Sequence, residues 1–222
     1  MATVAFIGSG RIGSTVARLS VAAGHTAVLS NSRGPGTLRE LVAELGPMAR
    51  GATPEDAAEA ADLVVVAIPM KAYDRVPVQP AVDKPVIDAD NYYPPRDGHF
   101  ADLDSGQLTS SELLQRHLPG ASVVKGFNNI YYKHLRNLAR PAAAPDRSYL
   151  PIAGDNPQAT TVVTRFLDSI GYGAVDYGPL AESWRQQPGE PVYGTAYGPY
   201  EDEHGHPAGE EHIRALLAAA TR

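Results

Sequence analysis

The chain has no cysteine, which excludes disulfide bonds, thiolate metal sites and cysteine nucleophiles. It has no excess of basic charge either: 19 Lys and Arg stand against 25 Asp and Glu, so a general affinity for nucleic acid or anionic membranes is not expected. No apolar run approaches the roughly 20 residues that cross a bilayer. No secretory signal precedes the first expected strand, and we therefore expect a cytoplasmic protein.

The seven histidines show no zinc-ligand spacing, and the acidic loop around His204 and His206 has the composition of a solvated surface segment. We therefore predict no metal site. The hydrophobic share of 43% over 222 residues is enough for a packed core in one large domain, or in a domain with a small appendage.

A short apolar strand near the start of the chain leads directly into a glycine-rich turn. The pattern G-x-G-x-x-G is formed by Gly8, Ser9, Gly10, Arg11, Ile12 and Gly13, and an amphipathic helix is expected over 14–23. In such a turn the glycines permit a tight bend, a close approach of phosphate to the backbone, and close packing of helix on strand. A strand at 26–30 completes the βαβ unit, which predicts a dinucleotide pyrophosphate site at the helix N-terminus.

The residues after the second strand indicate which dinucleotide is bound. A carboxylate at this point would hold the ribose hydroxyls of NAD, but the chain has Asn31, Ser32 and Arg33 there. A hydroxyl and a guanidinium can bind a 2′-phosphate that a carboxylate would repel. We therefore predict NADP(H) over NAD(H), although an arginine beside glycine and proline can also be a solvated loop cation.

The rest of the chain alternates expected helices and strands. The run 62–68 is continuously apolar and β-branched, as a central strand covered on both faces must be. Other strands are expected at 48–52, 86–90, 122–125, 149–154 and 174–178, and helices at 37–45, 53–61, 110–118, 155–170 and 210–220. The stretch 187–206 is too rich in proline and glycine for regular structure, so it either covers a site or is loosely attached.

This order predicts an α/β fold with a doubly wound, mostly parallel sheet, the Rossmann NAD(P)-binding fold. We place the dinucleotide-binding domain at residues 1–145. Residues 146–222 would form a small C-terminal α/β extension that completes a second pocket.

Four motifs together resemble the NADPH-dependent reductases of the deazaflavin coenzyme F420, a family related in its nucleotide domain to the STEAP metalloreductases. The motifs are the glycine-rich turn at 8–13, Asn31-Ser32-Arg33, Ala67-Ile68-Pro69 and Val124-Lys125-Gly126-Phe127-Asn128, and the resemblance spans about residues 3 to 180. It implies that NADP(H) is bound by the N-terminal domain, that the C-terminal part completes the second pocket, and that two subunits pair.

The resemblance also implies roles for single residues. Ser9, Arg11 and Ile12 would line the pyrophosphate turn, and Ser32 and Arg33 would grip the 2′-phosphate. In addition, Ile68 and Pro69 would flank the nicotinamide ribose, and Asn128 would belong to the wall beside the nicotinamide. The resemblance weakens after Leu180, where residues 184–189 replace an apolar helical segment, so the identity of the acceptor stays open.

Hydride transfer between two cofactor rings needs positioning at roughly 3 to 3.5 Å and exclusion of water, so no catalytic side chain is predicted. Lys125 is a candidate general acid, but a structural role is the commoner fate of such a lysine. For Asp88 and Asp90 we favour structural capping over chemistry. The tyrosine pairs Tyr92-Tyr93 and Tyr131-Tyr132 can stack on a ring or pack in a core or dimer, and Trp184 can close the second pocket or contact a subunit.

The leading hypothesis is an NADP(H)-dependent oxidoreductase that transfers a hydride between NADPH and an F420-like small-molecule acceptor. A second hypothesis keeps NADPH and changes the acceptor to a free flavin, a ferric chelate or a small imine. A third is a non-catalytic NADP(H)-binding sensor, which the nucleotide motif allows equally.

Overall fold

The computed structural model describes all 222 residues, Met1–Arg222, and contains one sheet of eight strands. Their spatial order is β3-β2-β1-β4-β5-β6-β7-β8. The strands are β1 Thr3–Ile7, β2 Thr26–Ser30, β3 Ala49–Gly51, β4 Leu63–Val66, β5 Pro85–Asp88, β6 Ser122–Lys125, β7 Tyr149–Gly154 and β8 Gly173–Asp176. All neighbouring strands are parallel except β6 and β7, so the mostly parallel sheet expected from the sequence is confirmed.

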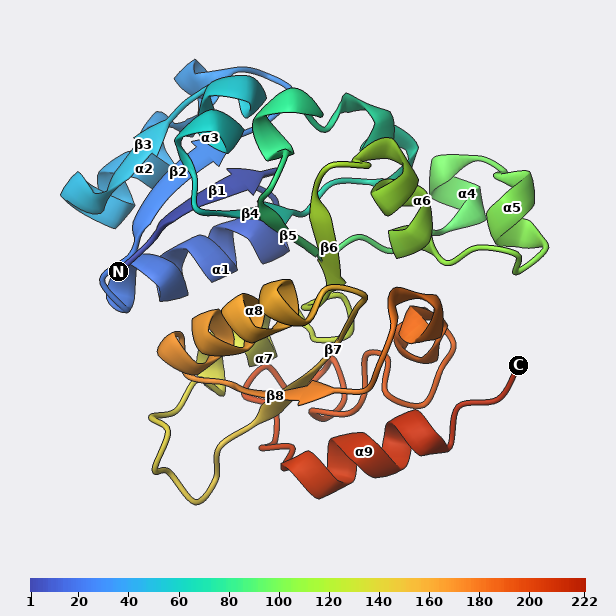
Figure 1. The fold of residues 1–222 in the computed structure, drawn as a ribbon. Coiled ribbons are helices and arrows are strands. Elements are labelled where there is room, and N and C mark those ends of the chain that lie inside the picture. Colours follow the sequence, from blue (N-terminus) through green and yellow to red (C-terminus); the bar gives the residue numbers. More distant parts are fainter.

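Helices cover both faces of this sheet, with α1 and α8 on one side and α3 and α6 on the other (Figure 1). The helices are α1 Arg11–Ala22, α2 Arg39–Leu45, α3 Pro54–Ala60, α4 Pro94–Asp97, α5 Ala101–Asp104, α6 Ser110–His117, α7 Tyr132–Asn137, α8 Pro157–Ser169 and α9 Glu210–Ala218. Short 3-10 segments lie at 35–38, 46–48, 70–75, 79–81 and 180–186. None of the helices combines the length and apolarity needed to cross a bilayer.

The alternation of side chains along β1 shows why its sequence is apolar throughout. Val4 and Phe6 belong to the hydrophobic cluster on the side of α1 and α8, whereas Ala5 and Ile7 belong to the cluster on the side of α3. A strand with helices on both faces has no solvated side, so a continuous apolar run is the expected pattern. The same reason explains β4, of which every residue is buried.

Local signals fix several helix starts. The Thr109 hydroxyl accepts from the Glu112 N–H while the Glu112 carboxylate accepts from the Thr109 N–H, a capping box that begins α6. Asn156 accepts from two backbone N–H groups at the start of α8, where Pro157 takes the first helical position. These caps confirm the sequence-based starts of both helices to within two residues.

The C-terminal part joins the same sheet. Strand β7 pairs with β6 through Val124 to Gly154 and Lys125 to Ala153, and β8 then pairs with β7 in parallel. A domain boundary near residue 145 therefore remains a proposal. No helix or strand occurs between 187 and 209, as its proline and glycine content predicts.

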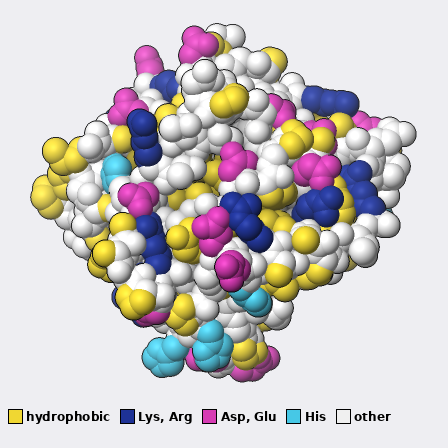
Figure 2. Space-filling view, turned by 60° about the horizontal axis from the view of Figure 1, so that its bottom comes forward, with side chains coloured by type: hydrophobic (Ala, Val, Ile, Leu, Met, Phe, Trp, Pro, Cys, Tyr) yellow, Lys and Arg dark blue, Asp and Glu magenta, His cyan; other side chains and the backbone are white.

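The sheet order reverses between β1 and β4: the chain runs outward from β1 to β2 and β3, then returns to β4 on the other side of β1. In open α/β sheets the crevice at the carboxyl ends of such strands is where ligands bind. On the face drawn in Figure 2, basic and acidic side chains are interspersed and not gathered by sign.

Candidate active site

The glycine-rich turn lies between the end of β1 and the start of α1. Two of its glycines are required by close packing, and the third leaves space for a ligand. A Cβ on Gly8 would lie 2.2 Å from the Ala67 carbonyl oxygen, and one on Gly13 would lie 2.0 Å from the Gly8 carbonyl oxygen. A Cβ on Gly10, in contrast, would have no atom within 4 Å. Gly8 and Gly13 are thus required by the packing of the fold, whereas Gly10 leaves open the space that an approaching phosphate needs.

The start of α1 is arranged for an anion. No side chain caps this helix, and its first turn contains no acidic residue. Its N-terminal N–H groups and the positive end of the helix dipole are therefore available to a ligand. The Ser9 hydroxyl donates to the Ser30 carbonyl at 2.9 Å and ties the turn to the end of β2. The donor set and the open space at Gly10 fit a pyrophosphate.

The loop after β2 is ordered by Asn31. Its Oδ1 accepts from the Arg33 N–H at 2.9 Å, and its Nδ2 donates to the Thr37 hydroxyl at 2.9 Å. Ser32 and Arg33 are exposed, and residues 31–38 include no carboxylate. The arrangement fits a 2′-phosphate held by the Ser32 hydroxyl and the Arg33 guanidinium.

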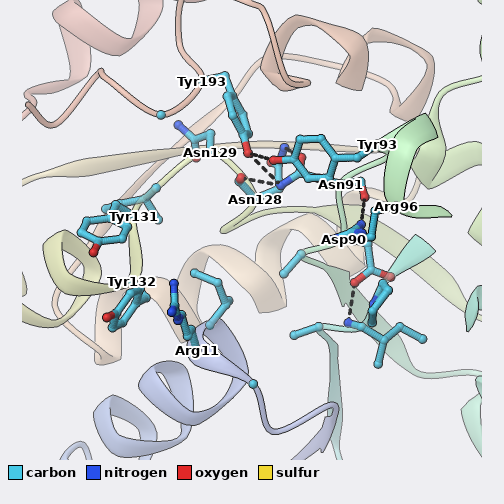
Figure 3. A pocket seen from close by; sticks show the side chains of 18 of the residues that line it. Arg11, Asp90, Asn91, Tyr93, Arg96, Asn128, Asn129, Tyr131, Tyr132 and Tyr193 are labelled. Atoms are coloured by element: carbon cyan, nitrogen blue, oxygen red, sulfur yellow. Dashed lines mark hydrogen bonds between the residues drawn. The ribbon is translucent and has the colours of Figure 1, made fainter. Parts of the chain in front are cut away.

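A cavity of about 480 Å³ opens at the carboxyl ends of β1, β4, β5 and β6 (Figure 3). Of the residues singled out in the sequence, those that line it are Gly10, Arg11, Ile12, Ala67, Ile68, Pro69, Asp90, Tyr93, Asn128, Tyr131 and Tyr132. Ser9, Asn31, Ser32 and Arg33 lie outside it, along the path that an adenosine half would take from the glycine-rich turn to β2. The structure therefore brings the predicted nicotinamide-side residues together and keeps the adenosine-side residues apart from them.

Residues 187–206, which we call the C-terminal strap, cover this cavity. Tyr193, Gly194 and Tyr200 of the strap line it, and Figure 3 shows Tyr193 beside Tyr93 on the side opposite Arg11. The hydroxyls of Tyr93 and Tyr193 are hydrogen-bonded to each other. Burial raises the pKa of Tyr193, so this hydroxyl keeps its proton. Of the two possibilities drawn from the sequence, the structure shows the first in part, because the strap is attached and covers a cavity.

Two asparagines after β6 fasten the strap and the residue just before it, Gln186. Asn128 Nδ2 donates to the Gln186 carbonyl at 2.7 Å, Asn129 Nδ2 donates to the Val192 carbonyl at 3.1 Å, and the Gly194 N–H donates to the Asn129 carbonyl at 3.0 Å. Phe127 turns the chain ahead of them with a positive φ of 63°, which is strained for a side chain other than glycine. Asn128 thus lines the cavity while its amide group holds the covering segment.

The structure does not support a role for Lys125 as a general acid. It is fully buried and outside the cavity, with its ammonium bonded to Asp88 Oδ2 at 3.0 Å, to the Asp90 carbonyl and to the Ser110 hydroxyl at 3.4 Å. Asp88 also accepts from the Ser111 hydroxyl at 2.6 Å. A buried charge pair of this kind positions the loop after β5, which confirms the structural interpretation of Lys125 and Asp88.

Asp90 has a structural role at the wall of the cavity. Its Oδ1 accepts from the Ile68 N–H at 2.7 Å, which holds the second residue after β4 in place. Burial raises the pKa of the Asp90 carboxyl, and the charge of Asp88 raises it further, against the opposing effect of Lys125. This agrees with the capping role expected from the sequence.

Two aromatic candidates lie elsewhere. The Tyr92 hydroxyl donates to Asp104 at 2.6 Å and accepts from the Phe100 N–H, and Tyr92 does not line the cavity. Trp184 stacks with Arg185 and Arg222 instead of closing the cavity.

Sequence reasoning did not identify five polar or aromatic residues of the cavity wall: Asn91, Arg96, Asn129, Tyr193 and Tyr200. Asn91 follows β5 and Asn129 adjoins Asn128, so their place at the carboxyl edge of the sheet was a usable signal. The two strap tyrosines carried none, because nothing local shows where an irregular segment returns.

The fold and this crevice define a dinucleotide-binding α/β protein of the Rossmann type. Residues 3–92 match the family model described as NADP oxidoreductase, coenzyme F420-dependent. A crystal structure of the hypothetical protein SMa0349 from Sinorhizobium meliloti is 33% identical, with a TM-score of 0.75, over 87% of this chain and 93% of that one. Residues 3–92 belong to this family of coenzyme F420-dependent NADP oxidoreductases, and by this match the protein is an NADP-dependent oxidoreductase.

Two other comparisons are weaker. A structure from Arthrobacter sp. FB24, described as a "putative f420 dependent nadp-reductase", shares the fold with a TM-score of 0.69 at 22% identity, over 82% of this chain and 87% of that one. The Escherichia coli K12 "Putative protein YjhV" is 40% identical over 53 residues, which are 24% of this chain and 39% of that protein. The match thus spans well under half of that protein. The relation to the STEAP metalloreductases remains a prediction.

Proposed function

We propose that this protein transfers a hydride between NADPH and a deazaflavin acceptor of the F420 type. The observation that carries the proposal is the composition of the cavity. One part of its wall is the glycine-rich turn with Ile68 and Pro69, and another consists of five tyrosine rings, Tyr93, Tyr131, Tyr132, Tyr193 and Tyr200. Flat amphipathic rings around about 480 Å³ suit a planar heterocycle that must lie against a nicotinamide.

The proposed roles of the chain are binding, orientation and exclusion of water. The start of α1 and Gly10 would hold the pyrophosphate, and Ser32 with Arg33 would hold the 2′-phosphate. Ile68, fixed through its N–H by Asp90, would set the depth of the nicotinamide end. When bound, NADPH supplies the hydride itself.

The strap would add the second half of the site. Its attachment through Asn128 and Asn129 holds Tyr193 over the cavity, so water is displaced from the side on which the acceptor enters. Holding two rings in contact and dry is the main requirement of such a transfer.

The test mixes the purified protein with NADPH and F420 under anaerobic conditions and follows the absorbance of both. We expect a matched loss of NADPH and oxidised F420, and no loss with a Gly10→Val variant, whose side chain would fill the space at the turn. Turnover with a flavin, a ferric chelate or an imine, but not with F420, would refute the proposed acceptor and keep the reductase. Tight NADP(H) binding without turnover on any acceptor would favour a sensor.

A further inference from the structure

Tyr93 and Tyr193 meet in the part of the cavity that lies away from the glycine-rich turn. Tyr93 directly precedes α4, Tyr193 belongs to the strap, and Figure 3 shows their hydroxyl groups joined on the side opposite Arg11. A dinucleotide that binds its pyrophosphate at the turn extends into the cavity from the Arg11 side. The space left for an acceptor is therefore next to the two tyrosine rings, both of which line the cavity.

The hydroxyl pair has one proton more than the chain uses. The two hydroxyl groups carry two protons, and only one of these lies in the hydrogen bond between their oxygens. Asn91 Nδ2 donates to the Tyr193 hydroxyl over a long 3.5 Å, and it donates its other N–H to the Asn128 carbonyl at 2.9 Å. Because the Tyr193 oxygen accepts from Asn91, its own proton is directed to Tyr93, and the proton of Tyr93 has no acceptor in the chain.

The surroundings of the pair suit a neutral donor. Burial raises the pKa of Tyr193, so this residue keeps its proton and can donate it to the Tyr93 oxygen. The Arg96 guanidinium lies 4.8 Å from the centre of the Tyr93 ring and is bonded to both carboxylate oxygens of Asp97, at 2.9 and 2.8 Å. A cation at this place stabilises negative charge that develops on Tyr93, and Asp97 offsets part of that effect.

We propose that Tyr93 is the proton donor to the acceptor and that Tyr193 positions it. The proposal rests on the proposed function, in which the acceptor gains a hydride. As the hydride leaves the nicotinamide ring and forms a C–H bond on the acceptor, the Tyr93 O–H bond breaks and its proton moves to a nitrogen or oxygen of the acceptor ring. The nicotinamide is oxidised, the acceptor is reduced by one hydride and one proton, and water at the mouth of the cavity returns a proton to the Tyr93 oxygen.

The experiment compares Tyr93→Phe and Tyr193→Phe with the unmodified protein in single-turnover stopped flow, with NADPH and F420 both saturating. Phenylalanine keeps the ring and removes only the hydroxyl. Tyr93→Phe should slow hydride transfer by about 100-fold, at the lower end of what general acids contribute. Tyr193→Phe removes only the hydrogen bond that orients the donor and should slow the transfer by about 3- to 10-fold. The Kd of NADP+ should hardly change in either variant.

The matched control is Tyr177→Phe, because the Tyr177 hydroxyl is buried without a partner and Tyr177 does not line the cavity. A second readout is the rate in D2O against H2O. Transfer by the unmodified protein should be slower in D2O, and this difference should vanish in Tyr93→Phe, whose hydride step no longer includes transfer of that proton.

Several results would overturn the donor. They are equal rates in Tyr93→Phe and the unmodified protein, a slow Tyr93→Phe that keeps the full effect of D2O, a larger loss in Tyr193→Phe than in Tyr93→Phe, and an equal loss in Tyr177→Phe. The two proposals also fail in different ways. Absence of hydride transfer from NADPH to F420 by the unmodified protein would refute the proposed function and the donor with it. Transfer that is independent of both hydroxyls would keep the proposed function and overturn the donor alone.

Discussion

Replacing Arg33 by alanine removes the only cation among residues 31–38, the turn that follows β2. The Asn31 side chain already fixes the backbone of this turn through the Arg33 N–H, so the substitution should leave its shape intact. A charge-assisted hydrogen bond contributes about 1.5–3 kcal/mol. Because Arg33 is exposed, screening by solvent places the loss at the lower end, about 1.5 kcal/mol, or about tenfold in the Kd of NADPH.

Calorimetric titration with NADPH and with NADH measures this effect, because NADH lacks the 2′-phosphate. The affinity for NADH should hardly change, and the preference for NADPH should shrink further as salt is added. Arg165→Ala serves as the control for a change in total charge. Equal losses for the two nucleotides would refute the assignment of Arg33 to the 2′-phosphate.

Three further predictions concern the turn and the buried charges. Gly10→Ala should weaken NADPH binding by at least about tenfold without lowering Tm. Gly13→Ala, whose Cβ would lie 2.0 Å from a carbonyl oxygen, should destabilise the fold by about 1–3 kcal/mol or more. Titration with NADPH and thermal unfolding distinguish the two effects, and an equal loss of Tm in both variants would contradict the steric argument. Lys125→Met should lower the free energy of unfolding by about 3–5 kcal/mol, because it leaves the Asp88 carboxylate buried without its partner. Urea unfolding measures this, and a decrease below about 1 kcal/mol would argue against a charged pair. Because burial raises the pKa of Asp90, the folded chain retains a proton that the unfolded chain releases, so the stability it contributes is complete below the unfolded pKa and declines as pH rises toward the folded one. Asp90→Asn should flatten this decline when urea unfolding is measured over a pH series upward from the unfolded pKa, and an unchanged slope would contradict the argument.

Much of the order of the elements follows directly from local patterns. The glycine-rich turn, the apolar run of β4 and the caps of α6 and α8 each depend on residues close in sequence, and each appears where expected. Strand ends were less predictable: residues 86–90 were expected as a strand, but β5 ends at Asp88. Beyond it the Asp90 carboxyl binds the Ile68 N–H, an interaction across 22 residues that no local pattern contains.

The acceptor side of the site shows more clearly what the sequence alone cannot predict. Tyr193 reaches the cavity because the strap is held by Asn128 and Asn129, about 60 residues earlier in the chain. The acceptors of those bonds are backbone carbonyls, which every residue possesses, so the sequence carries no mark of the pairing. Lys125 illustrates the converse: its position at the end of a central strand suggested chemistry, and only its burial with Asp88 shows a structural ion pair.

The way in which the strap is fastened has a consequence for divergence within this fold. Near the cavity the strap is held by peptide groups, while its buried Val192 and Tyr197 anchor it in the core, so the side chains that can be exchanged without releasing the segment are those that face the cavity. The glycine-rich turn cannot be varied in this way, because Gly8 and Gly13 leave no room for a methyl group. Engineering a new acceptor range for this protein should therefore begin with a library at Tyr193 and Tyr200, where new shapes can be tried against an unaltered hydride donor.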